Sequence, residues 1–409
     1  MKNLKTSLAL LSILALAVAA AASGALNRKG GGQGSMTGMH MPMSHAKVST
    51  PKAVQLRITL NRLLGEHAIL AIQATQRGLV GGKDFKAVAT ALDRNSVAIS
   101  KAIGSVYGPA AADRFLNGKD LWRAHIRYFV DYTVATAKHD KAGQAKAVAN
   151  LMTYVRTQAA FFAKATGLPK RALVDDLTAH VLQLKGQLDA FAKGNYAQAY
   201  ALTNGAYEHM GMTADLLAGA IAKQKHLGSI SSPAADLEVA LDRLLGEHAL
   251  LATWATQAGL NGDRNFPALA KQLDANSVAI SKAVGSVYGA AAAKRFLNGP
   301  NLWRAHVDDF VDYTVATAKG DKAGRKKAVA GLTAYIETQA SFFAKAIGLP
   351  KPALANDLTA HVLQLKGALD DYSAGRYGAT FALVDGSYAH MFMTGNVLAA
   401  GIAKQQGLR

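Results

Sequence analysis

Apolar residues recur three and four positions apart along most of the chain after residue 50, as in the run from Leu56 through Leu60, Leu63 and Leu64 to Leu70. This spacing places side chains on one face of an α-helix, whereas a half-buried strand alternates every second residue. Glycine and proline pairs interrupt the pattern at intervals, and such pairs are typical signals for the end of a helix. The pattern therefore predicts a series of amphipathic helices joined by short connections.

Between residues 51 and 227 these interruptions divide the pattern into six predicted helices. They are expected near 53–77, 84–106, 110–138, 142–165, 170–192 and 196–225. Short loops between long helices make sequence neighbours antiparallel. Alanine is abundant and aromatic residues make up only 7% of the chain, which favours closely packed helices over a sheet. We therefore predict an all-α fold of the up-down bundle type.

The whole pattern occurs twice. The segment NRLLGEHA at 61–68 returns as DRLLGEHA at 242–249, and DLTAHVLQLKG returns unchanged, both with the same shift of 181 residues and no gap. We therefore expect two tandem homologous antiparallel helical bundles of about six helices each, residues 51–227 and 234–409, joined by a Pro- and Ser-containing linker at 228–233. Half of the residues are hydrophobic, so each copy can bury a core of its own.

The N-terminal residues 1–25 have the composition of a secretory signal peptide. Two lysines precede an apolar stretch that ends in a run of small residues. An uncleaved membrane anchor is the alternative, because the apolar run is slightly long. We expect a periplasmic or extracellular protein with no membrane span in its mature chain. The chain has no cysteine, so it has no disulfide and no thiolate metal ligand.

The formal net charge is +19, from 46 basic and 27 acidic residues. Such an excess first suggests nucleic acid as a partner. Export and the scattered placement of the lysines argue against that, and no basic run alternates with stacking aromatics. An anionic envelope surface, an acidic partner or simply a solvated lysine-rich surface fits the charge better.

Histidine supplies the candidate chemistry. Eight of the twelve histidines occupy positions that recur in both copies: His67 and His248, His125 and His306, His180 and His361, His209 and His390. Each lies on the apolar face near the middle of its predicted helix. Mid-helix positions of an antiparallel bundle meet at one level whichever way each helix runs. The sequence therefore predicts one buried metal site per repeat, built from four inward imidazoles.

Further paired residues accompany these histidines. Asn95 and Tyr154, with their counterparts Asn276 and Tyr335, are predicted to orient the ligands from outside. Glu66 and Glu247 precede the first histidine of each copy and could serve either as a peripheral ligand or as an acceptor outside the ligand shell. Met212 and Met393 follow His209 and His390 by one helical turn, so a thioether could join each site, although methionine at such positions is commonly core filling.

Ordinary core histidines, each bonded to a neighbour, are the alternative to a metal site. Leaving one imidazole unpaired in a core costs about 1–3 kcal/mol. Four imidazoles at one level are therefore hard to accommodate without a metal or water.

A second group of soft ligands lies in residues 26–50, which are predicted to form a flexible tail. Six methionines and histidines fall within ten residues: Met36, Met39, His40, Met41, Met43 and His45. Thioether and imidazole together suit copper, whereas zinc, manganese and magnesium make little use of methionine. The stretch resembles the Met/His-rich motifs of bacterial periplasmic copper-resistance proteins. A low-complexity linker with chance methionines is the alternative.

GEHA near the start of each repeat and YAHMFMTG near the end of the second are similar to a helical domain of exported bacterial proteins that is named copper amine oxidase-like. This resemblance implies an association with copper. It does not extend to amine oxidase activity, which requires an Asn-Tyr-Asp/Glu motif. The nearest match, at Asn195–Ala197, lacks the acid and becomes Arg-Tyr-Gly at Arg376–Gly378.

The favoured interpretation is an exported, non-enzymatic copper-binding protein that buffers, stores or delivers copper, with a copper-handling protein as a partner. A haem-binding bundle is the main alternative, since two inward imidazoles can ligate haem axially between walls formed by Trp122, Phe129 and Tyr132. An oxidase or dismutase-like metalloenzyme lacks a clear general base. A metal-free envelope scaffold is the remaining alternative.

Overall fold

The computed structural model describes residues 50–409, and every regular element within that range is an α-helix. The predicted all-α class is confirmed for this part of the chain. The predicted signal peptide and the Met/His segment at 36–45 lie outside the described residues.

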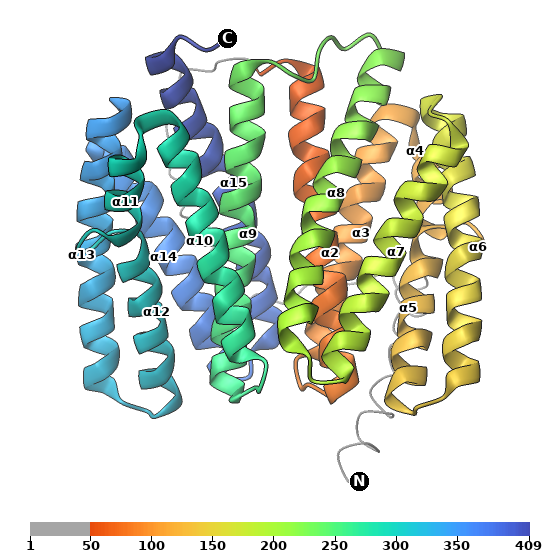
Figure 1. The fold of residues 1–409 in the computed structure, drawn as a ribbon, viewed down its shortest axis with the longest axis horizontal. Coiled ribbons are helices and arrows are strands. Elements are labelled where there is room, and N and C mark those ends of the chain that lie inside the picture. The colour runs from red at the N-terminus through yellow and green to blue at the C-terminus, as the bar shows by residue number, and fades with distance from the viewer. Residues whose placement is uncertain (1–49) are drawn as a thin grey trace, which may run out of the picture.

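The first half contains the helices from residue 52 to residue 224. They are α2 (Lys52–Val80), α3 (Phe85–Tyr107), α4 (Pro109–Asn117), α5 (Trp122–Ala137), α6 (Lys141–Thr166), α7 (Lys170–Ala192) and α8 (Tyr196–Gln224). The second half repeats this order. Its helices are α9 (Pro233–Asn261), α10 (Phe266–Tyr288), α11 (Ala290–Asn298), α12 (Trp303–Ala318), α13 (Lys322–Ile347), α14 (Lys351–Ser373) and α15 (Tyr377–Gln406). The two sets stand side by side with their long helices roughly parallel to one direction (Figure 1).

One predicted helix was wrong. The expected helix at 110–138 is divided into α4 and α5 by a turn. Gly118 is extended there, and an added Cβ would lie 2.4 Å from the carbonyl oxygen of Arg114. Asp120 then adopts a positive φ of 53°, which an aspartate tolerates better than most residues. Glycine and aspartate in sequence thus end one helix and redirect the chain into the next.

Helix α2 is the centre of the first half and packs against α3, α5, α7 and α8. Every residue from Leu63 to Ala74 is buried, as expected of a helix that is surrounded on all sides. Helix α9 has the same place in the second half and is buried without interruption from Leu245 to Ala255. Any polar side chain in the middle of α2 or α9 is therefore held in the interior.

Similar aromatic clusters mark the two halves. Trp122 packs on Phe115 at 4.8 Å between ring centres, and Phe115 also lies about 6 Å from Phe161. In the second half Trp303 packs on Phe296 at 5.0 Å. These clusters fix the start of α5 and α12, the helices that carry His125 and His306.

The halves share an extensive contact, mainly of α2 with α9 and of α8 with α10. The Gln73 side-chain amide donates to the Gln257 amide oxygen at 2.7 Å in the buried interface. Arg94 of α3 forms an ion pair with Asp385 of α15 at 2.6 Å. One hydrophobic cluster includes residues of both halves. Independent folding of the two predicted domains stays a prediction.

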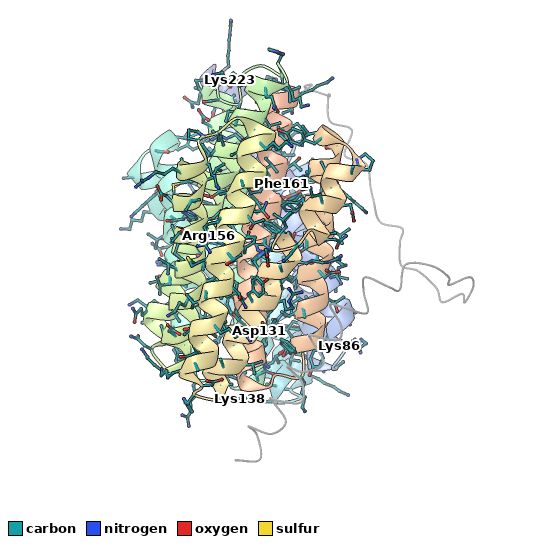
Figure 2. The ribbon with its side chains drawn as sticks, turned by 90° about the vertical axis from the view of Figure 1, so that its right-hand side faces the viewer. Lys86, Asp131, Lys138, Arg156, Phe161 and Lys223 are labelled. Carbon is teal, nitrogen blue, oxygen red and sulfur yellow. The ribbon has the colours of Figure 1, made fainter. Side chains whose placement is uncertain are left out.

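The outer surface carries the excess charge. Figure 2 shows Lys86, Lys138, Arg156 and Lys223 on the outside of the bundle and at its ends, and all four are exposed. Among the described residues, no helix has both the length and the apolar character needed to cross a bilayer.

Candidate metal centre

Three histidines from three helices meet in the interior of each half. In the first half they are His67 of α2, His125 of α5 and His180 of α7, and each is at most 3% exposed. In the second half the same group is formed by His248 of α9, His306 of α12 and His361 of α14. We call each group the histidine triad of its half. The triads agree with the prediction that mid-helix histidines point inward at one level.

Neighbouring aromatic rings hold the triad imidazoles in place. The ring of Tyr154 on α6 stacks on His125 with centres 4.5 Å apart and planes 23° apart. Tyr335 stacks on His306 in the same way at 4.4 Å. Trp122 lies 4.6 Å from His67, and its indole N–H donates to Ser96 at 3.1 Å. Tyr154 therefore lies next to the site, as predicted.

The spacing of the ring nitrogens suits a metal ion. The Nε2 atoms of His67 and His125 are 3.3 Å apart, and so are those of His248 and His306. Two nitrogens that are each about 2.0 Å from a metal, at the tetrahedral angle, are about 3.3 Å apart. Among the described residues, this close grouping of all three ligand atoms, within 4.8 Å of one another, is found in the second half and not in the first.

Burial keeps these imidazoles neutral. Desolvation lowers the pKa of His125 and of His306 to about 3, and desolvation together with neighbouring histidines lowers that of His180 to about 3. The pKa of His67 is lowered well below its ordinary value by burial and then by His125 and His180. A neutral imidazole offers the lone pair that a metal requires, so no proton needs to be displaced at neutral pH.

The triads are incompletely satisfied by hydrogen bonds alone. Two facing Nε2 atoms can share one hydrogen bond, but the Nδ1 atoms of all six triad histidines lack a hydrogen-bond partner within residues 50–409. An unsatisfied buried donor or acceptor costs about 1–3 kcal/mol. A metal ion held by the Nε2 atoms would use the Nε2 lone pairs that one shared hydrogen bond cannot satisfy, and the Nδ1 atoms would keep their protons.

The predicted outer residues form a layer beside the triad. Asn95 donates to Glu66 at 2.8 Å and to the Leu63 carbonyl at 2.9 Å. Asn276 donates to Glu247 at 2.9 Å, and its side chain also raises the pKa of His248 against the larger effect of burial. Each asparagine thus ties its own helix, α3 or α10, to the central helix that carries the glutamate and the histidine.

The glutamates themselves face the other half of the protein. Burial, followed by the charge of Asp385, raises the pKa of Glu66 to about 7. Burial raises that of Glu247 to about 7 as well. Each glutamate accepts a hydrogen bond from its asparagine, and the close group of ligand atoms in the second half consists of the three histidines without Glu247.

The fourth histidine of each half lies next to the triad and is bonded elsewhere. The Nε2 of His209 lies 3.1 Å from the backbone oxygen of Asp176 and 3.5 Å from its carboxylate. His390 contacts Asp357 in the same manner at 3.1 Å and 3.4 Å. The ring of His209 is stacked 6.4 Å from that of His180. The structure thus brings together three of the four predicted imidazoles.

The two methionines do not join the sites. Met212 is 59% exposed and Met393 is 54% exposed. The buried methionines are Met210 and Met391, at 4% and 3%. His209 is itself only half-buried at the edge of the packed face, and a step of three residues from that edge points to solvent. The predicted thioether ligands at 212 and 393 are therefore corrected to surface residues.

Asp176 and Asp357 are site residues that the sequence interpretation missed. Each accepts a hydrogen bond from a threonine four residues after the fourth histidine, Thr213 at 3.0 Å and Thr394 at 2.9 Å. Both aspartates stand four residues before a triad histidine in the unchanged segment DLTAH. An acid one helical turn from a paired histidine, present in both copies, was the available signal.

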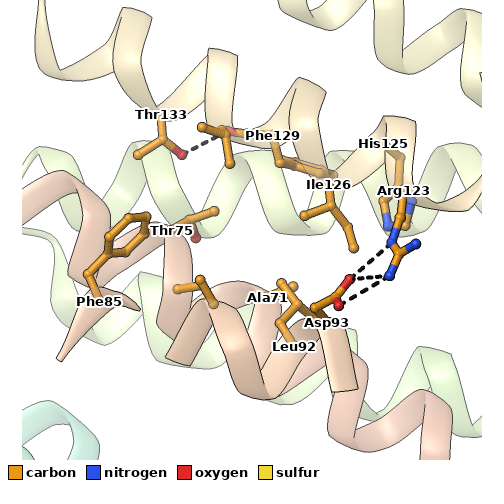
Figure 3. A pocket seen from close by; sticks show the side chains of 13 residues that line it. Ala71, Thr75, Phe85, Leu92, Asp93, Arg123, His125, Ile126, Phe129 and Thr133 are labelled. Carbon is orange, nitrogen blue, oxygen red and sulfur yellow. Dashed lines mark hydrogen bonds and ion pairs between the residues drawn. The ribbon is translucent and has the colours of Figure 1, made fainter. Parts of the chain in front are cut away.

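A hollow adjoins each triad, between the central helix and the two helices beside it. In the first half it is a cavity of about 40 Å³ next to His125. Figure 3 shows Ala71, Phe85 and Leu92 on one side and Phe129 on the other, with an Arg123–Asp93 ion pair at one end. In the second half it is a groove of about 440 Å³ that reaches His248 and His306.

Comparison with known proteins finds no matching family model, no similar curated protein and no similar solved structure.

Proposed function

We propose that this protein binds copper outside the cytoplasm and buffers, stores or delivers it, with one three-histidine site in each half. The observation that carries the proposal is the pair of neutral, buried imidazoles 3.3 Å apart, joined by a third from another helix. Ligands held on three separate helices are positioned before the ion arrives, which reduces the ordering cost of binding.

The donor set narrows the choice of metal. Imidazole suits copper, zinc, iron and nickel, whereas carboxylate and carbonyl oxygens suit magnesium, calcium and manganese. The triads contain imidazole alone. The Met/His segment at 36–45 adds soft thioethers, which favour copper over zinc. The signal-like residues 1–25 and the resemblance to copper-resistance motifs support an exported copper protein with a copper-handling partner.

A holding role fits the surroundings of the triad better than catalysis. Tyr154 is buried against His125, and burial raises its pKa, so its hydroxyl stays protonated. The Glu66 carboxyl is turned toward the other half and is bonded to Asn95. The Glu66 and Tyr154 side chains are therefore held in contacts of their own and are not directed at the metal position.

The packing speaks against haem as the occupant of the triad. Two axial imidazoles must face each other across the porphyrin plane. The nitrogens of His67 and His125 face each other at 3.3 Å, with Trp122 and Tyr154 against their rings. Tyr132, expected as a haem wall, instead donates to Asp189 at 2.7 Å.

Metal stoichiometry tests the proposal. The full chain is equilibrated with Cu(I) under reducing conditions or with Zn(II), desalted, and analysed for metal. We expect His125→Ala to remove one copper per chain, His306→Ala to remove one, and the double variant to remove both. His139→Asn is the matched control, because His139 is exposed and has a positive φ that asparagine tolerates. Equal copper content in the double variant and the control would refute the proposed sites.

A further inference from the structure

The two halves differ in the space beside their triads. The first-half cavity of about 40 Å³ is replaced in the second half by a groove of about 440 Å³. Its apolar walls include Phe266, Phe310, Val311 and Val315, and its inner end is formed by His248 and His306. The groove thus leads from the surface to two of the three imidazoles of one triad.

The phenylalanine and the valine that face each other across the seam are the same in both halves, whereas Val307 stands in the groove where the first-half cavity has Ile126, and the two helices pack less closely. In the first half Phe85 of α3 packs against Val130 of α5, and they are 3% and 8% exposed. The counterpart of Val130 is Val311, which is 39% exposed. The next valine along α12, Val315, is 45% exposed. Helices α10 and α12 therefore leave open the seam that α3 and α5 close.

Substitutions on the outer side of α12 accompany the open seam. Tyr128 of α5 donates a hydrogen bond to Asp120 in the turn before that helix. The corresponding residue of α12 is Asp309, which cannot donate in this way when ionised. Burial raises the pKa of Asp309, and the nearby Asp312 and Asp308 carboxylates raise it further. The contact that secures α5 is thus missing from α12, and like charges take its place.

The charged residues that line the groove all lie at one of its ends. Asp263 and Arg264 belong to the turn after α9, and Lys319 follows the end of α12. The remaining length is apolar apart from threonine hydroxyls and the two imidazoles. A ligand that fills the groove therefore needs an apolar body. At the inner end of the groove, the polar lining side chains that it meets are the imidazoles of His248 and His306.

We propose that the second-half centre, unlike the first, binds a small apolar molecule that donates one lone pair to the metal. This inference rests on the proposed metal site. Three histidines leave one position of a four-coordinate ion for an outside ligand, and the groove gives that ligand a path to His248 and His306. The first-half centre has the same ligands but only a small cavity beside them, so it holds its ion without admitting such a molecule.

The test uses the full chain loaded with Co(II), whose visible spectrum reports its coordination, after the metal content has been measured. Titration with 4-phenylimidazole, an apolar body with one donor nitrogen, is expected to change half of the cobalt signal and to saturate at one molecule per two metal ions. A response of both centres, or of neither, overturns the inference. A chain that binds no metal at two sites overturns the proposed function instead, so the two failures are distinguished.

A variant with a larger side chain in the groove gives a second test of the inference. Val311→Trp is expected to weaken binding of 4-phenylimidazole at least tenfold while the chain still holds two Co(II) ions. Val329→Trp is the control, because Val329 is 37% exposed on α13 and does not line the groove. Unchanged affinity in Val311→Trp, or an equal loss in Val329→Trp, contradicts the proposed path.

Discussion

The neutral state of the buried histidines makes a quantitative prediction about acid stability. The pKa of His125 is lowered to about 3 in the folded protein by burial, whereas an unfolded chain has an ordinary histidine pKa of about 6.5. As the pH falls below 6.5, the unfolded state binds a proton that the folded state does not. The free energy of unfolding of the metal-free protein therefore decreases from about pH 6.5 down to about pH 3.

The magnitude follows from the pH interval. A pH of 5 is about 1.5 units below the pKa of histidine in the unfolded chain, and each unit corresponds to about 1.36 kcal/mol. His125 alone should therefore lower the free energy of unfolding by about 2 kcal/mol at pH 5 relative to pH 7.5. The buried Glu66 and Glu247 act in the opposite direction, because their raised pKa values of about 7 make the folded state gain protons first. The contribution of the two glutamates cancels when wild type is compared with a variant that lacks only the His125 imidazole.

The assay is urea unfolding of metal-free wild type and His125→Gln at pH 7.5 and pH 5. Glutamine does not titrate, so the difference in unfolding free energy between wild type and variant should shift by about 2 kcal/mol against the wild type at pH 5. His139→Asn is the control substitution, at a histidine that is exposed in the folded state. A shift below about 0.5 kcal/mol for His125→Gln would show that the folded protein already protonates His125 at pH 5, and the neutral triad would be refuted.

Three further predictions concern the ligands and their support. Deleting 36–45 should slow copper loading or lower total copper without changing helical content or melting temperature, and identical loading would make that segment a linker. Met393→Leu should leave copper content and affinity unchanged, because Met393 is 54% exposed; a loss of copper would place its thioether at the site. Tyr335→Ala should lower the free energy of unfolding by about 3–5 kcal/mol, and it should weaken copper binding in the second half only, since Tyr335 stacks on His306. Unfolding titrations and per-site metal analysis measure the two effects, and an equal loss of copper from both halves would contradict the prediction.

Helical periodicity and stop signals were enough to predict the helices, because those features act locally. The one error, at 110–138, came from treating Gly118 and Asp120 as tolerable within a helix, although together they form a turn. Inward direction was also predictable for His67, because it shares an apolar stripe of its helix with Leu60, Leu63 and Leu64.

The direction of a side chain at the edge of the packed face of a helix was less predictable. The sequence around His209 is apolar on several sides, so it did not indicate which face packs against α7. The residue lies at the edge of the packed face and reaches Asp176, while Met212 points outward. The open groove could not be predicted, since Phe85 and Val130 recur unchanged as Phe266 and Val311. Their different exposure depends on how closely two helices approach, which is a tertiary property.

X-ray absorption spectroscopy of the copper-loaded chain lacking 36–45 tests the central claim most directly, because it reads the ligands of the bound ion without the segment that carries other donors. The histidine triads predict imidazole nitrogens at about 2.0 Å, with multiple scattering from about three rings per copper. Loss of that ring scattering in the His125→Ala and His306→Ala double variant is the expected companion result. A first shell dominated by sulfur, or a ring signal that survives the double substitution, would contradict the account.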